Sequence, residues 1–308
     1  MSQTPPTRSL AESAVATAVA LGLALVGGQS SIPIGPTSAL VALAMVSLAI
    51  QWLAFVPAYR LRTERYFDAM GSVGFLAVLT LGLVFAASND LLETRRIVVA
   101  TMVGLWTLRL GSFLFRRIHK AGSDPRFDHI KQDPFRFFMV WSLQGLWVSL
   151  TAMAALIVLV DSQPGPALGM WDALGIALWV LGFVVEVIAD HQKTVFRREP
   201  ENQGRWIDKG LWAYSQHPNY FGEILLWTGV FVTGAAVYDG LQWCAVLSPL
   251  FVAVLLTRIS GIPPLDERAL ELWGDDPAYL TYRQTTNVLV PGPRSLSTDG
   301  VHDSKPSD

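Results

Sequence analysis

The sequence is poor in charged residues, in cysteine and in histidine. Only 16% of its 308 residues are Asp, Glu, Lys or Arg, whereas soluble domains contain about 25%. The single cysteine, Cys244, excludes an internal disulfide and any zinc or iron–sulfur site built from cysteines. No two of the five histidines have helical metal-ligand spacing, so we expect no metal. The net charge of -2 gives no reason to expect a nucleic-acid partner.

Apolar residues, in contrast, make up 51% of the chain, and the mean hydropathy is +0.38. They gather in blocks close to the roughly 20 residues that a membrane-spanning helix needs. These blocks predict an all-α, polytopic transmembrane helix bundle with about seven to eight spans. The candidate segments are 10–28, 37–59, 69–87, 96–115, 137–160, 169–190, 217–237 and 241–259. We expect no cleavable signal peptide, because Glu12 and the pair Gly27-Gly28 make the first segment read as a short span.

The basic residues predict the orientation of these segments. All of them except Arg95, Arg96 and Arg109 lie in the N-terminal tail, in the loops after the second, fourth and sixth segments, or in the C-terminal stretch from Arg258 onward. The positive-inside rule places this side in the cytosol, and with eight spans both termini lie there. Residues 10–292 read as a single transmembrane domain. The tails, 1–9 and 293–308, contain Ser, Pro and Asp and are expected to be disordered.

Among the ionisable residues inside the predicted spans, four stand out, namely Arg109, Glu186, Asp190 and Glu223. A charge within a bilayer is costly, so such residues are candidates for function. Glu186 and Asp190 share one helical face, and Glu223 follows the polar run 214–220. Each residue also has a structural alternative: Arg109 as part of an ion pair that holds the bundle together, and the carboxylates as groups hydrated at the interface.

The joint position of these carboxylates beside Arg197, Arg198 and Arg205 favours a binding site open to the cytosol. Guanidinium groups suit phosphates, and carboxylates and amides suit a ribose, so a nucleotide is the ligand class that we expect. The sequence contains no Gly-rich Rossmann motif and no Walker loop. His191 and His217 are candidates for lining a cofactor pocket, with hydrogen bonds at helix ends as the alternative. Most of the eleven tryptophans lie near predicted span ends, as interfacial belts do.

The stretch 210–223, Gly-Leu-Trp-Ala-Tyr-Ser-Gln-His-Pro-Asn-Tyr-Phe-Gly-Glu, resembles the C-terminal signature of the steroid 5-alpha-reductase family. Three further stretches, 63–72, 189–197 and 260–283, also resemble motifs of that family. Together they extend over about residues 50–292. The sequence is most similar to bacterial members without an assigned substrate. The resemblance therefore implies a bacterial inner-membrane protein with the architecture shared by these reductases and the isoprenylcysteine methyltransferases.

The resemblance implies an NADPH-dependent oxidoreductase that saturates an activated carbon–carbon double bond, in an enone or enoyl group. Its substrate would be a lipophilic small molecule, of steroid or isoprenoid type, that enters from the membrane lipids. Family members have seven spans, so segment 10–28 would be an addition. By the resemblance the cofactor contacts are Asp190, Arg197, Asn219 and Glu223, with Arg126 and Arg205 less securely aligned. Three residues in or beside these motifs complete the candidate cofactor set: Glu186, Tyr214 and His217.

The resemblance also places Glu64 where the family has a carboxyl group that holds the substrate carbonyl. Hydride transfer to the β-carbon of an enone develops negative charge on the carbonyl oxygen, and a hydrogen-bond donor stabilises it. We expect apolar surroundings to raise the pKa of Glu64, so that it remains a protonated donor. The steroid reductases use a tyrosine on the fourth segment as well, but none lies between Ala100 and Phe115. Tyr66 is a poor substitute candidate, and Glu186 stands where the family has asparagine.

Two other functions stay open. Isoprenylcysteine and phospholipid methyltransferases use S-adenosylmethionine and share a His-Pro-x-Tyr-x-Gly element, found here at residues 217–222. Glu223 directly after the glycine, with Asp190 and Arg197 upstream, favours the reductase. A non-catalytic membrane protein of the same fold would tolerate the loss of Glu64 and Glu223. The oligomeric state is open, because lipid-facing and partner-facing surfaces look alike in sequence.

Overall fold

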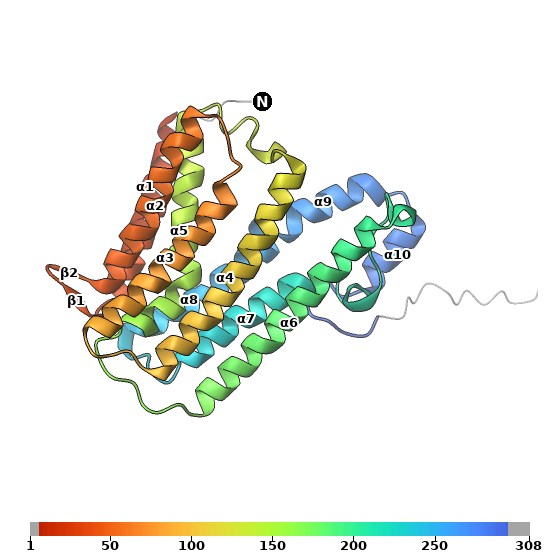
Figure 1. The fold of residues 1–308 in the computed structure, drawn as a ribbon. Coiled ribbons are helices and arrows are strands. Elements are labelled where there is room, and N and C mark those ends of the chain that lie inside the picture. Colours follow the sequence, from red (N-terminus) through yellow and green to blue (C-terminus); the bar gives the residue numbers. More distant parts are fainter. Residues whose placement is uncertain (1–5, 295–308) are drawn as a thin grey trace, which may run out of the picture. The chain divides into compact units, whose positions relative to one another are not determined.

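A computed structural model of the chain describes residues 6–294, and apart from a short β1–β2 hairpin (Pro33–Ile34 and Thr37–Ser38) its regular elements are helical (Figure 1). The α-helices are α1 (Pro6–Gly27), α2 (Ala39–Arg60), α3 (Phe67–Ser88), α4 (Thr94–Ala121), α5 (Pro134–Val160), α6 (Met170–Arg198), α7 (Pro218–Gly234), α8 (Leu247–Val254), α9 (Ile262–Trp273) and α10 (Pro277–Thr285). Short 3-10 turns join several of them, and a π-helical turn (Leu255–Ile259) links α8 to α9. The prediction of an all-α protein is confirmed.

Seven helical segments of the described chain are long and apolar enough to cross a membrane. Six are α1 to α6, and the last runs through 3-10, α and π turns from Gly240 to Trp273. The seventh predicted segment corresponds to α7, whose 17 residues lie at the short end of the range for a span. The prediction of a polytopic helix bundle with seven to eight spans is confirmed. Cytosolic termini stay a prediction.

Two helices extend further than the apolar pattern predicted. The structure continues α4 to Ala121 and α6 to Arg198, although the apolar segments were expected to end at residues 115 and 190. The added turns contain Arg and Lys, which are good helix formers in water. The helix α6 ends before Glu199, which is extended because it precedes a proline.

The structure describes only part of the two predicted tails. The helix α1 begins at Pro6, so residues 6–9, which the sequence assigned to a disordered tail, are helical. Residues 1–5 and 295–308 lie outside the described part of the chain.

The contacts divide the chain into two compact units. Unit 1 comprises Met1–Ala177 and Trp227–Phe251, and unit 2 comprises Leu178–Leu226 and Val252–Asp308. The helix α6 therefore begins in unit 1 and ends in unit 2. The single domain predicted over residues 10–292 stays a prediction.

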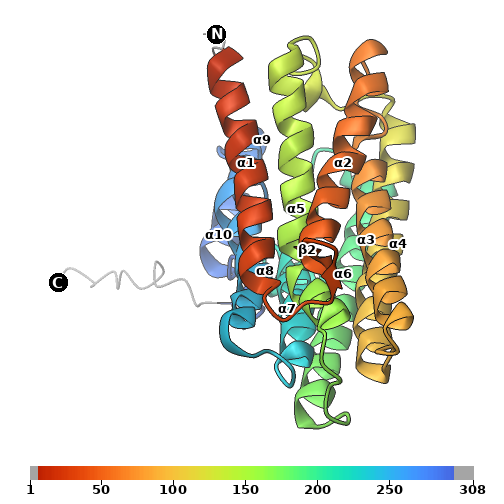
Figure 2. The ribbon, with the colours of Figure 1, turned by 90° about the vertical axis from the view of Figure 1, so that its left-hand side faces the viewer.

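The central helix of unit 1 is α5. It packs against both α1 and α2, and Figure 2 shows it between them. Every residue of α5 from Val148 to Val160 is buried. The buried face of α1 consists of small residues at near-helical spacing, which allow the two backbones to approach closely. These residues are Ser9, Ser13, Ala16, Ala20, Ala24 and Gly27.

Several tryptophans lie in the core of unit 1. Trp106, Trp141 and Trp227 are at most 1% exposed, and the rings of Trp106 and Trp227 meet edge to face with centroids 4.9 Å apart. These three tryptophans therefore do not belong to an interfacial belt, because side chains from other helices surround them. Trp171 is 47% exposed, as the predicted belt requires.

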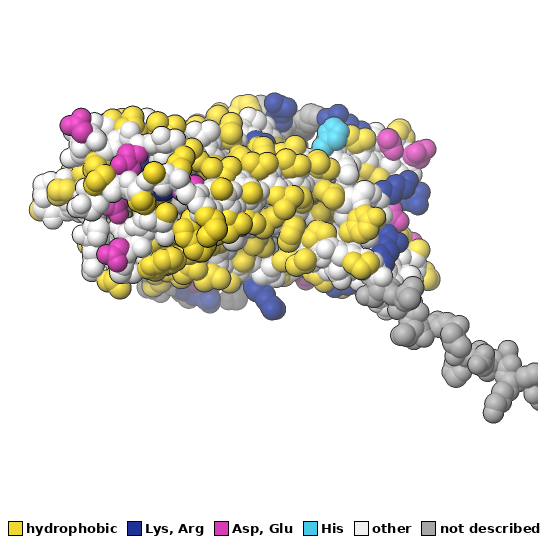
Figure 3. Space-filling model, turned by 90° about the horizontal axis from the view of Figure 1, so that it is seen from below, with side chains coloured by type: hydrophobic (Ala, Val, Ile, Leu, Met, Phe, Trp, Pro, Cys, Tyr) yellow, Lys and Arg dark blue, Asp and Glu magenta, His cyan; other side chains and the backbone are white. Residues whose placement is uncertain are grey.

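Large apolar side chains remain exposed on the outer faces of the helices. Leu53 is 72% exposed, Leu181 54% and Val84 49%. Figure 3 shows hydrophobic side chains over much of the visible surface. A soluble protein rarely exposes so much apolar surface in continuous patches, whereas a helix in lipid requires it. The surface therefore agrees with an integral membrane protein.

Candidate functional site

Unit 2 contains a cavity of about 530 Å³. Its walls come from the end of α6, from the segment that leads to α7, and from α9 and α10. Four basic side chains line it, namely Lys193, Arg197, Arg205 and Arg268, and Asp266 is the one carboxylate among the lining residues. This excess of positive charge suits an anionic ligand.

Aromatic rings form another part of the cavity wall. Trp206, Trp273 and Tyr279 contact one another, with ring centroids 5.2, 5.5 and 6.0 Å apart. The ammonium group of Lys193 lies 4.4 Å from the ring centroid of Trp212, a cation–π contact. Flat rings of this kind can stack with the heteroaromatic ring of a ligand.

Helical spacing directs the side chains of α6 and α9 into the cavity. Lys193 and Arg197 are four residues apart on α6, and Leu265, Ala269 and Leu272 recur at intervals of four and three on α9. The helix α6 therefore supplies two cations, and α9 supplies an apolar surface together with the charged side chains of Asp266 and Arg268.

The start of α10 positions two tyrosines of the wall. The Asp276 side chain accepts a hydrogen bond from a backbone N–H two residues on, and Pro277 occupies the first helical position. Tyr279 and Tyr282 follow and are buried. Burial raises the pKa of both phenols, which therefore stay protonated. The Tyr282 hydroxyl donates to the carbonyl of Trp212 at 2.8 Å.

His217 lies in the cavity wall beside Asp266. The histidine is 7% exposed, and its Nε2 is 3.6 Å from Asp266 Oδ1. Arg283 Nη2 donates to the other Asp266 oxygen at 3.0 Å. Burial lowers the pKa of His217 to about 4, although the charge of Asp266 opposes that shift. The imidazole is therefore neutral at pH 7 and can both donate and accept a hydrogen bond.

Three of the predicted cofactor residues line this cavity: Arg197, Arg205 and His217. Tyr214 is 54% exposed and is not among the lining residues. The polar run 214–220 therefore divides, and only part of it contributes to the cavity.

Four further candidates lie on α6 and α7 within unit 2. Asn219 Nδ2 donates to Asp190 Oδ1 at 3.2 Å. Glu186 is 3% exposed, and a Cβ added to Gly222 would come within 2.7 Å of its backbone nitrogen, so the two helices approach closely beside Glu223. None of these residues is among those lining the cavity. Their contact with a cofactor stays a prediction.

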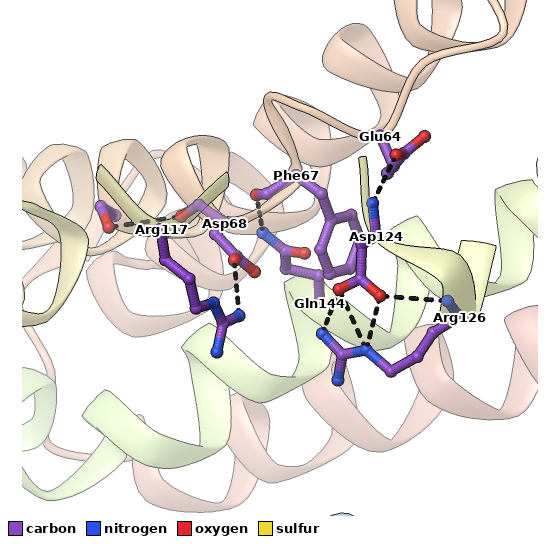
Figure 4. A network of polar contacts seen from close by, with 8 residues as sticks. Glu64, Phe67, Asp68, Arg117, Asp124, Arg126 and Gln144 are labelled. Atoms are coloured by element: carbon purple, nitrogen blue, oxygen red, sulfur yellow. Dashed lines mark hydrogen bonds and ion pairs between the residues drawn. The ribbon is translucent and has the colours of Figure 1, made fainter. Parts of the chain in front are cut away.

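Glu64 belongs to a polar network in unit 1 (Figure 4). Its Oε1 accepts from the backbone N–H of Asp124 and its Oε2 accepts from Lys131 Nζ, both at 2.9 Å. Burial raises the pKa of Glu64, but these hydrogen bonds outweigh it and hold the pKa below its usual range. The prediction of a protonated Glu64 is therefore wrong. The reason is that the backbone N–H of Asp124 and the ammonium group of Lys131, both from a distant loop, lie beside this carboxylate, and the sequence did not predict either contact.

The residues around Glu64 join two loops of unit 1. Arg62 donates to two carbonyls of the loop 122–133 at 2.9 and 3.1 Å, and Arg65 Nε donates to a third at 2.7 Å. With Glu64, these side chains fasten that loop to the loop 61–66. The motif 63–72 thus has a structural role in this chain.

Two other predicted residues also lie in unit 1. Arg126 makes a bidentate pair with Asp124, with Nη2 2.6 Å from Oδ2 and Nε 3.0 Å from Oδ1 (Figure 4). Those hydrogen bonds overcome the effect of burial and lower the pKa of Asp124. Tyr66, the substitute for the family tyrosine, is 55% exposed at the start of α3. Cofactor binding by Arg126 and catalysis by Tyr66 stay predictions.

Arg109, which the sequence singled out within a span, is partly buried on α4. Its guanidinium carbon lies 6.0 Å from the ring centroid of Phe113.

The sequence assigned no role to several residues that line the unit 2 cavity. They include Lys193, Trp212, Gln216, Asp266 and Arg268. The spacing of Lys193 and Arg197 was one available signal, because it places two cations on one helical face. Asp266 gave no such signal, since only folding brings α9 to α6. Within residues 6–294, no group of three or more His, Cys, Asp or Glu residues could hold a metal ion.

Comparisons with known proteins give a family and a partial likeness. Residues 54–286 match the family described as "Protein of unknown function (DUF1295)". An uncharacterized protein of Schizosaccharomyces pombe is 25% identical over 186 residues, which cover 52% of this chain and 54% of that protein. The chain thus spans about half the length of that relative.

A shorter likeness connects the chain with an enzyme. The 3-oxo-5-alpha-steroid 4-dehydrogenases 1 of Mus musculus and Rattus norvegicus are each 36% identical to it over 55 residues. That stretch covers 18% of this chain and 22% and 21% of the two enzymes. No solved structure matches the chain significantly. Since the family match extends over most of the sequence, the chain belongs to the DUF1295 family.

Proposed function

We propose that this protein is a membrane-embedded, NADPH-dependent reductase that saturates an activated carbon–carbon double bond of a lipophilic substrate. The observation that carries the proposal is the lining of the unit 2 cavity, where Lys193, Arg197 and Arg205 occur together with aromatic rings. The local similarity to 3-oxo-5-alpha-steroid 4-dehydrogenases supports it. Bound NADPH would supply the hydride.

The cavity offers partners for several parts of such a nucleotide. Arg197 and Arg205 suit phosphate oxygens, which a guanidinium group binds with two parallel hydrogen bonds. The rings of Trp206 and Tyr279 suit the base. Asp266 is an acceptor for a ribose hydroxyl or an amino group.

The substrate would come from the membrane, since apolar side chains cover much of the helical surface. An ionised carboxylate accepts hydrogen bonds and donates none. For Glu64 to donate a hydrogen bond to the carbonyl of the substrate, its ion pair with Lys131 would therefore have to open and its carboxylate would have to take up a proton. We further propose that the protein lies in a bacterial inner membrane with both termini in the cytosol, in line with the basic loops.

The test is thermal unfolding of the detergent-purified protein with NADPH, NADH or S-adenosylmethionine. A ligand present at about 100 times its dissociation constant stabilises a protein by about 2.7 kcal/mol. We expect NADPH to raise the melting temperature, and Arg197→Ala to abolish this rise. The matched control is Arg198→Ala, which changes an exposed neighbour outside the cavity lining and should keep the rise.

A methyltransferase is the second candidate, because residues 217–222 also match the element of that class. A melting shift with S-adenosylmethionine alone would favour it and contradict the reductase. The reductase proposal would also fail if NADPH stabilised the wild type and Arg197→Ala equally, since binding would then occur elsewhere.

A further inference from the structure

The last described residues of unit 2 form a strap beside the cavity. The strap, Arg283–Arg294, is hydrogen-bonded to residues 208–216. The main-chain N–H of Gln216 donates to the strap at 2.8 Å, and that of Gly292 donates back at 3.1 Å. The Ser215 hydroxyl adds a bond to a strap carbonyl at 2.7 Å. The signature stretch thus depends on a segment that follows it by about 70 residues.

Gln216 contacts both the strap and the cavity. Its side chain is among those lining the cavity. Its amide Nε2 donates to the carbonyls of Arg283 at 2.9 Å and of Thr286 at 2.6 Å. Both carbonyls lie at the C-terminal end of α10, where no further helical turn supplies donors. One side chain therefore caps a helix, holds the strap and forms part of the binding surface.

A second residue connects the strap with the cavity. Arg283, the first residue of the strap, donates to Asp266 at 3.0 Å, and Asp266 lines the cavity beside His217. Release of the strap would therefore remove hydrogen-bond partners of two lining residues, Gln216 and Asp266.

Hydrogen bonds hold the strap more than apolar burial does. Val288 is 51% exposed and Val290 60%. A segment with little buried apolar surface opens more easily than the core of the same protein. The strap can therefore respond to what occupies the cavity.

We propose that docking of the strap and binding of a nucleotide in the unit 2 cavity are coupled, with Gln216 as the latch. The proposal rests on the proposed function, because NADPH is taken as the nucleotide. The docked strap holds Gln216 and Asp266 in place for the ligand, and the ligand in turn keeps the strap docked. Coupling between two binding events is reciprocal, so the strap favours NADPH by the factor by which NADPH favours the docked strap.

The test compares Gln216→Glu with Gln203→Glu in the full-length protein. Both residues line the cavity and both changes add the same charge, but the backbone N–H of Gln203 donates to the carbonyl of Pro200, and no hydrogen bond between Gln203 and the strap is found among the described residues. NADPH affinity is measured together with hydrogen exchange of peptides from the strap, which contain the Gly292 amide. Gln216→Ala is a third variant, which removes the donor without adding a charge.

In the wild type we expect NADPH to slow exchange of the strap. Gln216→Glu and Gln216→Ala should speed that exchange without ligand and weaken NADPH binding by about tenfold, the loss expected for the two hydrogen bonds of this amide. Gln203→Glu should leave exchange of the strap at the wild-type rate. Exchange of α5 peptides, measured in each variant, reports whether the core remains folded.

Two results would overturn the coupling while leaving the reductase proposal intact. One is a wild type that binds NADPH with no change in strap exchange. The other is a Gln216→Ala protein with a released strap and unchanged NADPH affinity. Failure of NADPH to bind the wild type at all is a different outcome, because it contradicts the proposed function itself and the coupling with it.

Discussion

Lys131 Nζ donates to Glu64 Oε2 at 2.9 Å, which joins the loop after α2 to the loop before α5 in unit 1. The side chains of Glu64 and Lys131 are 3% and 18% exposed, respectively. Because both charges are largely removed from water, each depends on the other for its stability. Glu64 is therefore first a part of the fold, and any role toward a substrate comes in addition to that.

Replacing Glu64 by Gln should lower the free energy of unfolding by about 1–3 kcal/mol, because Lys131 loses the charge of its buried partner. The measurement is the melting temperature in detergent. The matched control is Asp128→Asn, which removes the other partner of Lys131, a carboxylate that is 53% exposed. An exposed pair contributes at most about 1 kcal/mol. Equal effects of the two variants would contradict the structural role of Glu64.

The protein should lose stability as the pH falls from about 6.5 toward 4, because of His217. Burial lowers its pKa from 6.5 to about 4 in the folded state. Between these values the unfolded chain binds a proton that the folded chain does not, so acid favours unfolding. The full shift corresponds to about 3 kcal/mol. His217→Gln should flatten the pH dependence of the melting temperature over this range. The exposed His191→Gln should leave it unchanged, and a flattening by both would rule out His217 as the source.

A substitution in the buried ion pair of Arg95 and Asp172 in unit 1 should strongly lower the stability of the protein. Arg95 Nε and Nη2 donate to the two oxygens of Asp172 at 2.7 and 2.9 Å, and both side chains are 2% exposed. Asp172→Asn should destabilise the protein by about 3–5 kcal/mol, since it leaves a buried guanidinium without its counter-charge. The control is Asp90→Asn at an exposed turn with φ 57°, which asparagine tolerates. Stability is measured by thermal unfolding. A similar loss of stability in both variants would contradict the stabilising role of the Arg95–Asp172 ion pair.

The helices α6 and α7 pack so closely in unit 2 that we expect a methyl group added at Gly222 to disturb their contact. A Cβ at this position would lie 2.6 Å from the carbonyl oxygen of Gly182 and 2.7 Å from the backbone nitrogen of Glu186. Gly222→Ala should therefore destabilise by about 1–3 kcal/mol. Gly104→Ala is the matched control, because no atom lies within 4 Å of its added Cβ on α4 and alanine favours a helix by about 0.5–1 kcal/mol. The two melting temperatures should shift in opposite directions. A rise in both would refute the close packing.

The positions of the helices could be predicted from the sequence because their cause is local. A span needs a continuous apolar block whose length matches the bilayer, so segments such as 37–59 and 137–160 agree closely with α2 and α5. The same apolar pattern could not predict that α6 continues to Arg198. The last turns of this helix are polar, and the first residue that signals its end is Pro200.

The site was only partly predictable, because a local sequence pattern shows only those lining residues that are close together in the chain. Arg197, Arg205 and His217 lie close together in the sequence, and the structure finds them along one cavity. Asp266 and Tyr282 come from α9 and α10, and only folding brings them to the end of α6. No local sequence pattern predicts such a tertiary contact.

The sequence by itself determined the class of protein, the approximate positions of the apolar helices and the basic character of several connecting loops, because these follow from composition and chain order. Only the tertiary structure decided the protonation of Glu64 and His217. A pKa depends on which groups and how much water surround a residue. The backbone N–H of Asp124 and the ammonium group of Lys131 keep Glu64 ionised, and burial by segments distant in the chain keeps His217 neutral against the charge of Asp266.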